Sequence, residues 1–572
     1  MPKDKIKNYI LACLPYIIML LVIIYGISYQ LVNRATVVGS DTMIHFQRFY
    51  DAMAQIKTGN YSYFQMNYGL YRTGRVFNAI YGPFFAYLNG ILLLICGTWY
   101  RFEIISIIAV HLIGAISMYQ LSLKVKTNKW IALLLSLIYT ESNFVVSFER
   151  FNFMGWGGAL APLVIIQAVN MVQDHKRPIH WLQLALIMSI IAQIHLWSTL
   201  MLTITIIPFA IYGLIKTIDK KEMIISCLKS IGLAILLTAN IWGAMLLLYR
   251  SNNLALPNAH SLRGYAFKIV SDQNFHAALL LSTAIVIILQ AVYILFHFKK
   301  IPLNTLATSV AVFWLIVASR LMPWFRLQAK YPKFRASIQF PYRLSIGIWP
   351  LIFMAIGITL THLNLKYGLK AKILAFIVLI LMVKQNVAIT RNYNKFFVDI
   401  YLNDSKVITN GNYYKMPKDR VQFRNILYKT NSRKLLDLSL RAQPDYLPAK
   451  TSATNDIFEQ QVLKQLKYYK YKVKGDRLYL FWQSKNTKKR YLPIVMYSQS
   501  HLIVNGKDAT DVTKNKIYQP YVQSGVGSNS AILYFIAPTW FWILMWLSIL
   551  SWLWLLVYGI KKSFHRSKHL FS

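Results

Sequence analysis

The sequence predicts a polytopic α-helical membrane protein with about 12 transmembrane helices and a small extracytoplasmic β-rich domain. Of its 572 residues, 56% are hydrophobic and only 15% are charged, and the mean hydropathy is +0.39. The apolar residues fall in blocks of about 20, the length that a helix needs to cross a bilayer. A late segment of alternating polar and apolar residues predicts strands.

The expected topology starts from a cytoplasmic N-terminus, because Lys3, Lys5 and Lys7 precede the first apolar run. Residues 81–97 are apolar enough to span, but a span there would place the basic stretch 124–129 outside. We therefore expect 81–97 to lie along the membrane interface. Both termini then lie inside, and spans are expected near 9–30, 101–123, 130–147, 156–173, 180–199, 201–217, 227–249, 277–298, 302–322, 344–363, 372–390 and 537–560.

Three parts are expected along the chain. Residues 1–390 would form a transmembrane module with a long first outer loop at 31–100. Residues 391–536 would form the extracytoplasmic β-rich domain, and residues 537–572 the last transmembrane helix with a basic cytoplasmic tail.

The β-rich domain is expected from local patterns. The run "DRLYLFW" at 476–482 alternates between polar and apolar residues, as in a strand with one buried face. The dipeptide Asn505-Gly506 follows another such run and predicts a hairpin turn.

The charge balance restricts the class of partner. The formal net charge is +43, from 63 Lys and Arg against 20 Asp and Glu. Cytoplasmic loops account for part of this excess, but it persists in loops that we place outside. Since the positive-inside pattern of a membrane protein already explains much of the charge, nucleic acid is not the expected partner. The excess in the outer loops favours anionic membrane lipid, lipid-linked phosphate or an anionic wall polymer as the partner. No P-loop, GxSxG or HExxH motif is present, so soluble nucleotide chemistry is unsupported.

The first candidate site directly follows the first span, in "GSDTMIHFQRFYDAM" at 39–53. Asp41, His45 and Arg48 are spaced i, i+4, i+7 and share one face of a helix. Ser40 is a candidate N-cap, and an acid in the first turn stabilises the helix dipole, which would explain Asp41 without chemistry. The alternative is a catalytic Asp41 with substrate-facing partners.

Aromatic residues interleaved with arginine continue the same outer loop, at 60–75. Tyr68, Tyr71 and Arg72 are candidates for acceptor or sugar binding, because aromatic rings suit the apolar faces of sugars and guanidinium suits phosphate. An aromatic belt at the membrane interface would explain the same cluster.

A second cationic outer loop lies at 319–345. Because positive charge is expected inside, this loop is a candidate site for a lipid-linked phosphate, and general attraction to anionic headgroups is the alternative. Its candidate phosphate ligands are Arg326, Lys333, Arg335 and Arg343.

Ionisable residues near the ends of two spans complete the candidates. Glu149 and Arg150 would form either part of a site or an interfacial ion pair. His195 lies within or at the outer end of a span, where ionisable groups are often functional. A neutral, hydrogen-bonded histidine would explain it equally well.

Four motifs, in this order along the chain, resemble a known family. They are "GSDTMIHFQRF" at 39–49, "IQFPYRL" at 338–344, "PDYLP" at 444–448 and "LPIVMYSQSHLIVNGK" at 492–507. Together they resemble bacterial YfhO-like or 6-pyruvoyl-tetrahydropterin-synthase-related membrane proteins, within the GT-C superfamily of polytopic glycosyltransferases. The resemblance implies sugar transfer from a polyprenyl-phosphate donor to a glycolipid, teichoic acid or polysaccharide on the outer face of a bacterial plasma membrane.

The resemblance also implies residue roles. Asp41 takes the position of the acid that acts as catalytic base or holds a metal, and Arg343 that of an arginine that binds donor phosphate, with Arg48 as a further phosphate ligand. His45 is left with an orienting or sugar-binding role. One feature departs from the family pattern, since Arg150 is not followed by Gly-Glu.

The cofactor and the class of activity are left open by the residues. Asp51 is the only other acid in the loop that holds Asp41, so no metal motif is present and a divalent cation stays an open cofactor. A flippase or transporter of lipid-linked sugars and a non-catalytic envelope-assembly protein are the alternative functions.

Overall fold

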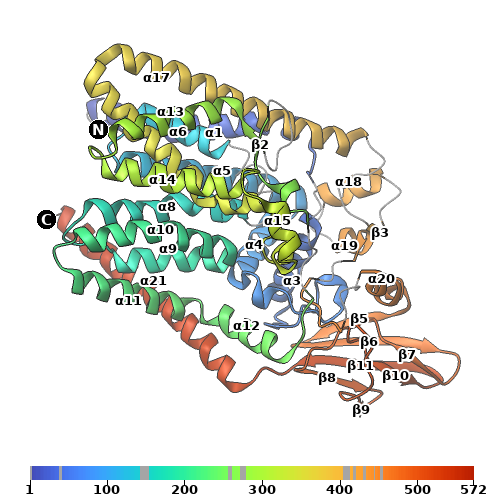
Figure 1. Ribbon diagram of the computed structural model, residues 1–572. Coiled ribbons are helices and arrows are strands. Elements are labelled where there is room, and N and C mark those ends of the chain that lie inside the picture. Colours follow the sequence, from blue (N-terminus) through green and yellow to red (C-terminus); the bar gives the residue numbers. More distant parts are fainter. Residues whose placement is uncertain are drawn as a thin grey trace.

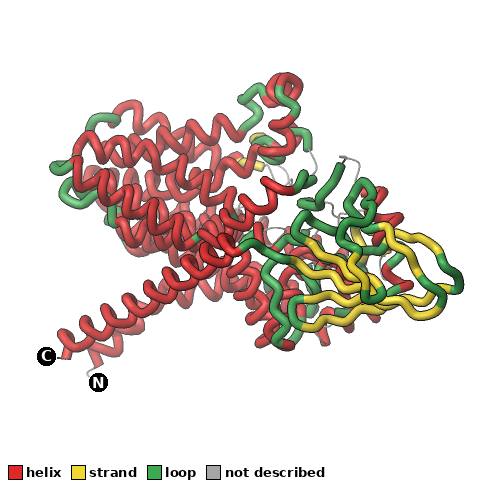
Figure 2. The backbone as a smooth tube through the Cα atoms, turned by 90° about the horizontal axis from the view of Figure 1, so that it is seen from below, coloured by secondary structure: helices red, strands yellow, loops and turns green. Residues whose placement is uncertain are grey.

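The computed structural model describes residues 3–37, 41–141, 154–255, 260–270, 278–403, 413–415, 420–429, 433–442, 445–450 and 455–571. A bundle of apolar helices makes up most of the molecule, and a smaller region with strands lies at one end of it (Figure 1). Figure 2 shows that both termini lie at the opposite end from the strands. The expected assignment of these two ends to the cytoplasm and the exterior stays a prediction.

Several helices among the described residues are long and apolar enough to cross a membrane. There are six, and a seventh if the pair α11 (Lys220–Leu237) and α12 (Ala239–Ser251), bent by 65°, forms one broken span. They identify the chain as a polytopic membrane protein. The six are α5 (Trp99–Lys124), α8 (Met154–Gln173), α10 (Leu196–Lys216), the segments Pro341–Leu363 and Lys366–Leu402, and Thr539–Lys562 of α21 (Thr539–Phe571).

Twelve spans were expected, and each expected span overlaps a helix. The others are shorter in their apolar part than a full crossing requires, so the number twelve stays a prediction. These are α1 (Lys3–Gly26), α6 (Lys129–Thr140), α9 (Trp181–Ile194), α13 (Leu281–His297) and α14 (Pro302–Ala318).

Local sequence signals set where several helices begin or break. Asn128 and Asp219 cap α6 and α11 by accepting hydrogen bonds from backbone N–H groups in the first turn. Gly368, with φ 67°, interrupts α17 (Ile348–Asn403) near the start of the second of its two apolar segments. This left-handed conformation costs glycine little, and it separates the two spans expected on either side.

The segment expected at the membrane interface forms α4 (Pro83–Cys96), a 14-residue apolar helix. It packs on α3 (Thr42–Thr58), which carries the first candidate site, and on α5. With 14 residues α4 is too short for a perpendicular crossing. Its interfacial placement stays a prediction.

The strands form a five-stranded antiparallel sheet in the order β5-β6-β11-β8-β9. The expected strand at 476–482 is β6, and the expected hairpin turn is confirmed between β8 and β9, where Asn505 and Gly506 both have positive φ (49° and 81°). The strands are β5 (Lys470–Lys474), β6 (Arg477–Ser484), β8 (Ser500–Val504), β9 (Lys507–Asp508) and β11 (Gly527–Phe535), with β7 (Lys488–Tyr491) paired to β10 (Tyr521–Ser524).

Only the later half of the expected β-rich domain forms this sheet. The described residues before Lys470 are mainly helical, because their apolar residues have helical rather than alternating spacing. They form α18 (Arg420–Lys429), α19 (Lys434–Leu438), α20 (Asn455–Phe458) and the short strands β3 (Tyr413–Lys415) and β4 (Leu440–Arg441). The remaining α-helices and strands of the described residues are α2 (Ser28–Val32), α15 (Trp324–Lys330), α16 (Lys333–Ile338), β1 (Lys268–Val270) and β2 (Ala278–Leu280).

The first outer loop packs against the sheet region. Val495 N donates to Thr73 O at 2.8 Å, and Gln65 Nε2 donates to Leu533 O at 3.1 Å. Residues separated by more than 400 positions therefore share one structural unit at this end of the bundle.

Candidate functional site

Asp41 is the residue that precedes the first turn of α3, and it is partly buried. It occupies the N-cap position, yet its side chain makes no capping hydrogen bond. Capping therefore does not account for this carboxylate. Ser40, the expected N-cap, lies outside the described residues.

Charged residues from distant parts of the chain surround Asp41. Burial raises the pKa of the Asp41 carboxyl above its ordinary value, and the charge of Asp445 acts in the same direction. The positive charges of Arg441 and Arg343 oppose this effect by lowering the same pKa. The fold thus brings one acid of the first outer loop to two arginines and a second acid, from segments about 300 to 400 residues further on.

Arg48 is fully buried two turns further along α3. Its Nε donates to Asn78 Oδ1 at 2.9 Å and its Nη2 donates to the Tyr81 carbonyl oxygen. The guanidinium also lies over the Tyr81 ring, 4.7 Å from its centre. Arg48 therefore fixes the loop that passes beside the first turns of α3.

His45 lies between Asp41 and Arg48 on the same helical face, as the spacing predicts. Its Nδ1 is 3.2 Å from Arg48 Nη1, and its ring is 6.3 Å from the ring of Tyr81. Burial and the charges of Arg48 and His195 lower the pKa of His45 well below its ordinary value. The imidazole is therefore neutral at pH 7.

His195 separates α9 from α10, and its extended backbone (φ −155°) ends one helix and starts the next. Its Nδ1 accepts a hydrogen bond from Ser198 N at 3.3 Å and lies 2.8 Å from Ser198 Oγ. His195 is thus a helix N-cap. Its ring also meets the Tyr81 ring edge to face, with centres 5.9 Å apart, so it borders the site.

Among the described side chains of the second cationic loop, Arg343 is the cation whose charge acts on Asp41. Arg343 is partly buried, stacks 4.4 Å from the centre of the Phe340 ring and donates to Gln339 Oε1 at 2.7 Å. Its Nε is buried and has no hydrogen-bond partner among the described residues. This arginine is held by packing, and part of its donor capacity is left for a ligand.

The other expected phosphate ligands lie further out. Arg335 is exposed, and its Nε donates to His260 O at 3.4 Å. Arg326 is exposed on α15. Lys333 begins α16, and its side chain lies outside the described part of the structure, as do both Glu149 and Arg150.

The aromatic candidates of the first loop connect it to the C-terminal region. The hydroxyl of Tyr68 is 2.8 Å from Thr58 Oγ1. Tyr71 is only 4% exposed, and its hydroxyl accepts a hydrogen bond from Arg441 N at 3.0 Å. Arg72 lies 4.5 Å from the centre of the Tyr471 ring. These three contacts are structural, and none of them joins the residue to Asp41.

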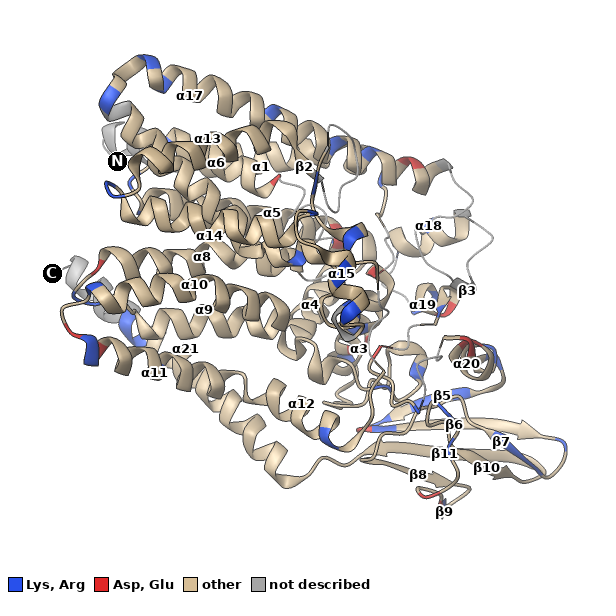
Figure 3. Ribbon diagram, viewed as in Figure 1, with Lys and Arg blue, Asp and Glu red and all other residues tan. Residues whose placement is uncertain are grey.

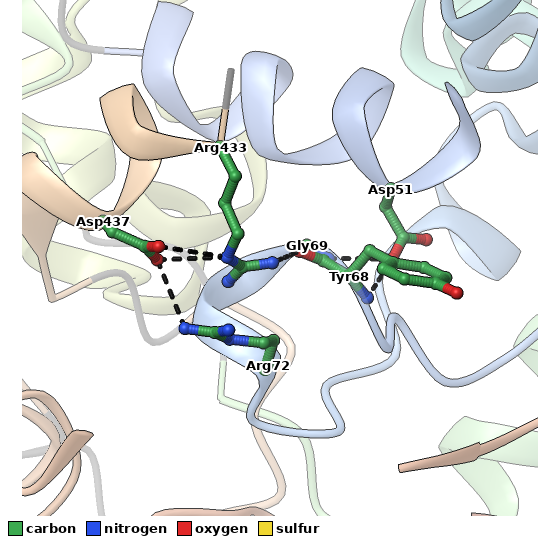
Figure 4. Close-up of polar contacts among 6 residues, drawn as sticks. All are labelled: Asp51, Tyr68, Gly69, Arg72, Arg433 and Asp437. Atoms are coloured by element: carbon green, nitrogen blue, oxygen red, sulfur yellow. Dashed lines mark hydrogen bonds and ion pairs between the residues drawn. The ribbon is translucent and has the colours of Figure 1, made fainter. Parts of the chain in front are cut away.

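Figure 4 shows the polar contacts that connect the first outer loop to α3 and to the C-terminal region. Asp51 Oδ1 accepts hydrogen bonds from the backbone N–H groups of Tyr68 and Gly69, both at 2.8 Å. Arg433 donates to the Tyr68 carbonyl oxygen and pairs with Asp437, which also lies 3.5 Å from Arg72. Asp51, to which the sequence assigned no role, is thus the carboxylate that anchors this loop to α3.

Four residues near the site were not assigned by the sequence: Tyr81, Arg441, Asp445 and Tyr446. Burial raises the pKa of Asp445, and the charges of Arg75 and Arg441 lower it. The Asp445 carbonyl oxygen accepts a hydrogen bond from Arg75 Nη2 at 2.5 Å. The available signal was "PDYLP", in which two prolines flank the acid.

A bound metal ion would need several carboxylate, imidazole or thiolate ligands close together. No group of three or more His, Cys, Asp and Glu residues that could hold a metal ion occurs in the described ranges. The charges nearest to Asp41 include two arginines, which disfavour a cation at the same point.

Comparisons with known proteins identify no family. No family model matches the sequence, and no curated protein matches it. Among solved structures, the chain is similar to the crystal structure of the Archaeoglobus fulgidus oligosaccharyltransferase in its apo form, with a TM-score of 0.40 and 11% sequence identity. The match covers 76% of this chain and 61% of that chain, less than two thirds of its length. A likeness this slight carries no functional argument.

The class of protein follows from the chain itself. It is a mostly helical membrane protein with a small sheet. Just before α3 it holds the partly buried Asp41, on which the charges of Arg343, Arg441 and Asp445 act.

Proposed function

We propose that this chain is a membrane glycosyltransferase that moves a sugar from a polyprenyl-phosphate donor to a cell-envelope acceptor on the outer face of a bacterial plasma membrane. One observation carries the proposal: the Asp41 carboxylate makes no capping bond and lies within reach of the charges of Arg343 and Arg441. An acid beside two cations supplies a base for an acceptor and a counter-charge for a phosphate leaving group.

In the proposed reaction, the acceptor hydroxyl attacks the anomeric carbon of the sugar. Asp41 takes the hydroxyl proton while the new glycosidic bond forms. The bond from the anomeric carbon to the phosphate oxygen breaks, and its electron pair leaves with the polyprenyl phosphate. Arg343 and Arg441 stabilise the negative charge that develops on that leaving group.

The environment of Asp41 suits a general base. A buried carboxylate with a raised pKa holds a proton more strongly than an exposed one, so it is the stronger base once it is ionised. Neutral His45, also near Arg48, offers a hydrogen-bonding ring nitrogen toward the acceptor without adding positive charge beside the base.

The test uses purified protein in nanodiscs with a polyprenyl-phosphate sugar, and it measures the release of polyprenyl phosphate. D41N should lower the rate by about 100-fold or more, the usual range for a lost general base. R343A should lower it by about 10-fold or more, because one charge-assisted contact to the leaving group is lost. The exposed Arg326 provides the matched control, and R326A should retain the wild-type rate.

If D41N and R343A both release polyprenyl phosphate at the wild-type rate, with normal expression and folding, the proposal is wrong. A protein that never releases polyprenyl phosphate with any sugar donor, even as wild type, would instead favour a non-catalytic role in envelope assembly.

A flippase of lipid-linked sugars is the second candidate, and one observation favours it. Helices α11 and α12 meet at a 65° bend, and α9 and α10 are interrupted at His195, and broken helices near a polar site are typical of transporters. A flippase needs the cations but no base. Translocation of the intact donor in liposomes that survives in D41N and is lost in R343A would identify it.

A further inference from the structure

A hollow of about 640 Å³ lies on the sheet region, well away in sequence from the residues around Asp41. It is found where the start of β5 lies beside the end of β6, next to the turn that leads from β6 to β7. Its lining includes the cationic and aromatic residues Tyr468, Lys470, Phe481, Lys485, Lys488 and Arg490. Among the described residues, none that lines the hollow is Asp or Glu.

The positive charge of the hollow is not neutralised by the protein. In the part of the chain that the structure describes, none of the ion pairs involves Lys470, Lys485, Lys488 or Arg490. Residues 470–535 as a whole contain eleven Lys or Arg against three Asp, and Figure 3 shows Lys and Arg on β5 and β7. Like charges that gather on one surface repel each other, and an anion bound between them relieves that repulsion.

Arg490 is the best-placed cation for ligand binding. Its Nη2 donates to Ser484 Oγ at 2.9 Å, which sets the direction of the guanidinium. Its Nε is buried, and it has no hydrogen-bond partner within the described residues. A phosphate oxygen would satisfy a donor of this kind.

Two aromatic rings are exposed at the same hollow. Phe481 is 39% exposed and Tyr468 is 59% exposed. Phe481 lies directly opposite Lys470 in the β5–β6 register, so an aromatic ring and an ammonium group share one position on the sheet. A bare polyanion gains little from exposed rings, whereas the apolar face of a sugar stacks on them.

The framework of the hollow is fixed before any ligand binds. Ser484 Oγ donates to Asn486 O at 2.8 Å and so closes the turn after β6. Trp482 Nε1 donates to Ser524 Oγ at 3.1 Å and ties β6 to β10. Side chains carried by such a rigid sheet lose little conformational freedom when a ligand binds.

We propose that this hollow is a binding site for an anionic glycan, a chain of sugars that carries phosphate groups. The four cations would contact the phosphates, and Phe481 and Tyr468 would stack against the sugars. The site shares no residue with the surroundings of Asp41, so binding does not require the proposed transfer reaction.

The experiment measures the affinity of the full-length protein in nanodiscs for a phosphate-bearing oligosaccharide, at low and at high salt. Two comparison ligands separate the contribution of the sugars from that of the phosphates. They are a neutral oligosaccharide with the same backbone, and inorganic polyphosphate of equal charge. A single-stranded DNA oligonucleotide of equal charge tests the other class of polyanion.

The double variant K485Q/K488Q removes two charges from the hollow, and both side chains are exposed. Its matched control is K507Q/K516Q, which removes two exposed charges from the same region, with Lys507 on β9 at the opposite edge of the sheet. F481A removes the exposed ring.

We expect K485Q/K488Q to weaken binding of the phosphate-bearing oligosaccharide by about 10-fold, with the control within about 2-fold, and the difference to shrink at high salt. F481A should lower the affinity for the phosphate-bearing oligosaccharide by about 5-fold and leave polyphosphate binding unchanged. D41N should bind as wild type does, which separates this site from the proposed chemistry.

Equal losses in K485Q/K488Q and K507Q/K516Q would overturn the site, because binding would then follow net charge alone. Polyphosphate or DNA that binds as tightly as the oligosaccharide would overturn the assignment to a glycan. Unfolding is excluded by the melting temperature of each variant.

Discussion

The guanidinium of Arg48 lies 4.7 Å from the centre of the Tyr81 ring and also donates a hydrogen bond to the Tyr81 carbonyl oxygen. A helix and a loop that are 33 residues apart are thereby held together at the candidate site. This contact places Tyr81 between Arg48 and His195, and the charges of Arg343 and Asp41 also act on Tyr81. It is the structural relationship on which the arrangement of the site depends.

R48K is expected to disable the site although the charge is kept. Lysine lacks the planar fork that reaches both Asn78 and Tyr81, and it cannot stack on the ring in the same way. We expect at least a 10-fold loss of polyprenyl-phosphate release and a stability loss of about 1–3 kcal/mol from the unmade hydrogen bonds. Release assays and thermal unfolding measure the two effects, and R326K serves as the exposed control.

The rate of the proposed transfer should depend on pH through Asp41. A base acts only when it is ionised, and burial raises the pKa of this carboxyl. The acidic limb of the rate profile should therefore fall at a pH above the ordinary Asp pKa of about 3.9. R343A removes a charge that lowers this pKa, so it should move the limb to higher pH. A limb that stays in place in R343A would show that the titrating group is another residue.

Asp51 should make stability depend on pH in the opposite sense from an ion-paired carboxylate. Burial raises its pKa to about 6, against the lowering effect of its hydrogen bonds from Tyr68, Gly69 and Gln55. The folded state then binds a proton more tightly than the unfolded state, so stability falls as pH rises from about 4 to about 6. This difference corresponds to about 2–3 kcal/mol.

D51N should remove that part of the pH dependence, because asparagine keeps an oxygen that can accept from Tyr68 and Gly69 but does not titrate. Thermal unfolding in detergent, followed by tryptophan fluorescence at a series of pH values, measures the slope for each protein. An identical slope in both would refute the assignment to Asp51.

G82A should disturb both stability and the site. Gly82 has φ +59°, and an added Cβ would lie 2.6 Å from the carbonyl oxygen of Gln193. We expect a loss of about 1–3 kcal/mol, together with displacement of Tyr81 and lower release. Gly232 within α11 has open space around it and ordinary helical φ, so G232A should instead stabilise the protein by about 0.5–1 kcal/mol. The melting temperature should therefore fall in G82A and rise in G232A relative to the wild type.

Local features were predicted well. The apolar blocks became helices, and the Asn505-Gly506 turn joins the two strands that it was expected to join. Asp41, His45 and Arg48 lie on one face at the start of α3, as their spacing required. Helix period, span length and turn conformation depend on a few neighbouring residues, so they can be read without knowledge of the fold.

Other expectations depended on contacts that the sequence does not record. Arg335 and Arg326 seemed equivalent to Arg343 in one cationic loop, but only Arg343 reaches the surroundings of Asp41. Tyr71 and Arg72 were expected to face a sugar, and in the structure they bind Arg441 and Asp437. Whether a polar side chain makes structural contacts or faces a ligand depends on its partner, and that partner can lie anywhere in the chain.

By itself, the sequence determined the class of the protein and the helical face that carries Asp41, because the hydropathy of a segment and the geometry of a helix depend on neighbouring residues. The tertiary structure alone decided which charges meet there. Arg441 and Asp445 come to Asp41 from about 400 residues further along the chain. Tyr81, in the same outer loop as Asp41, is held near it by the contact with Arg48. Such meetings follow from how helices and loops pack, and packing is a property of the whole chain.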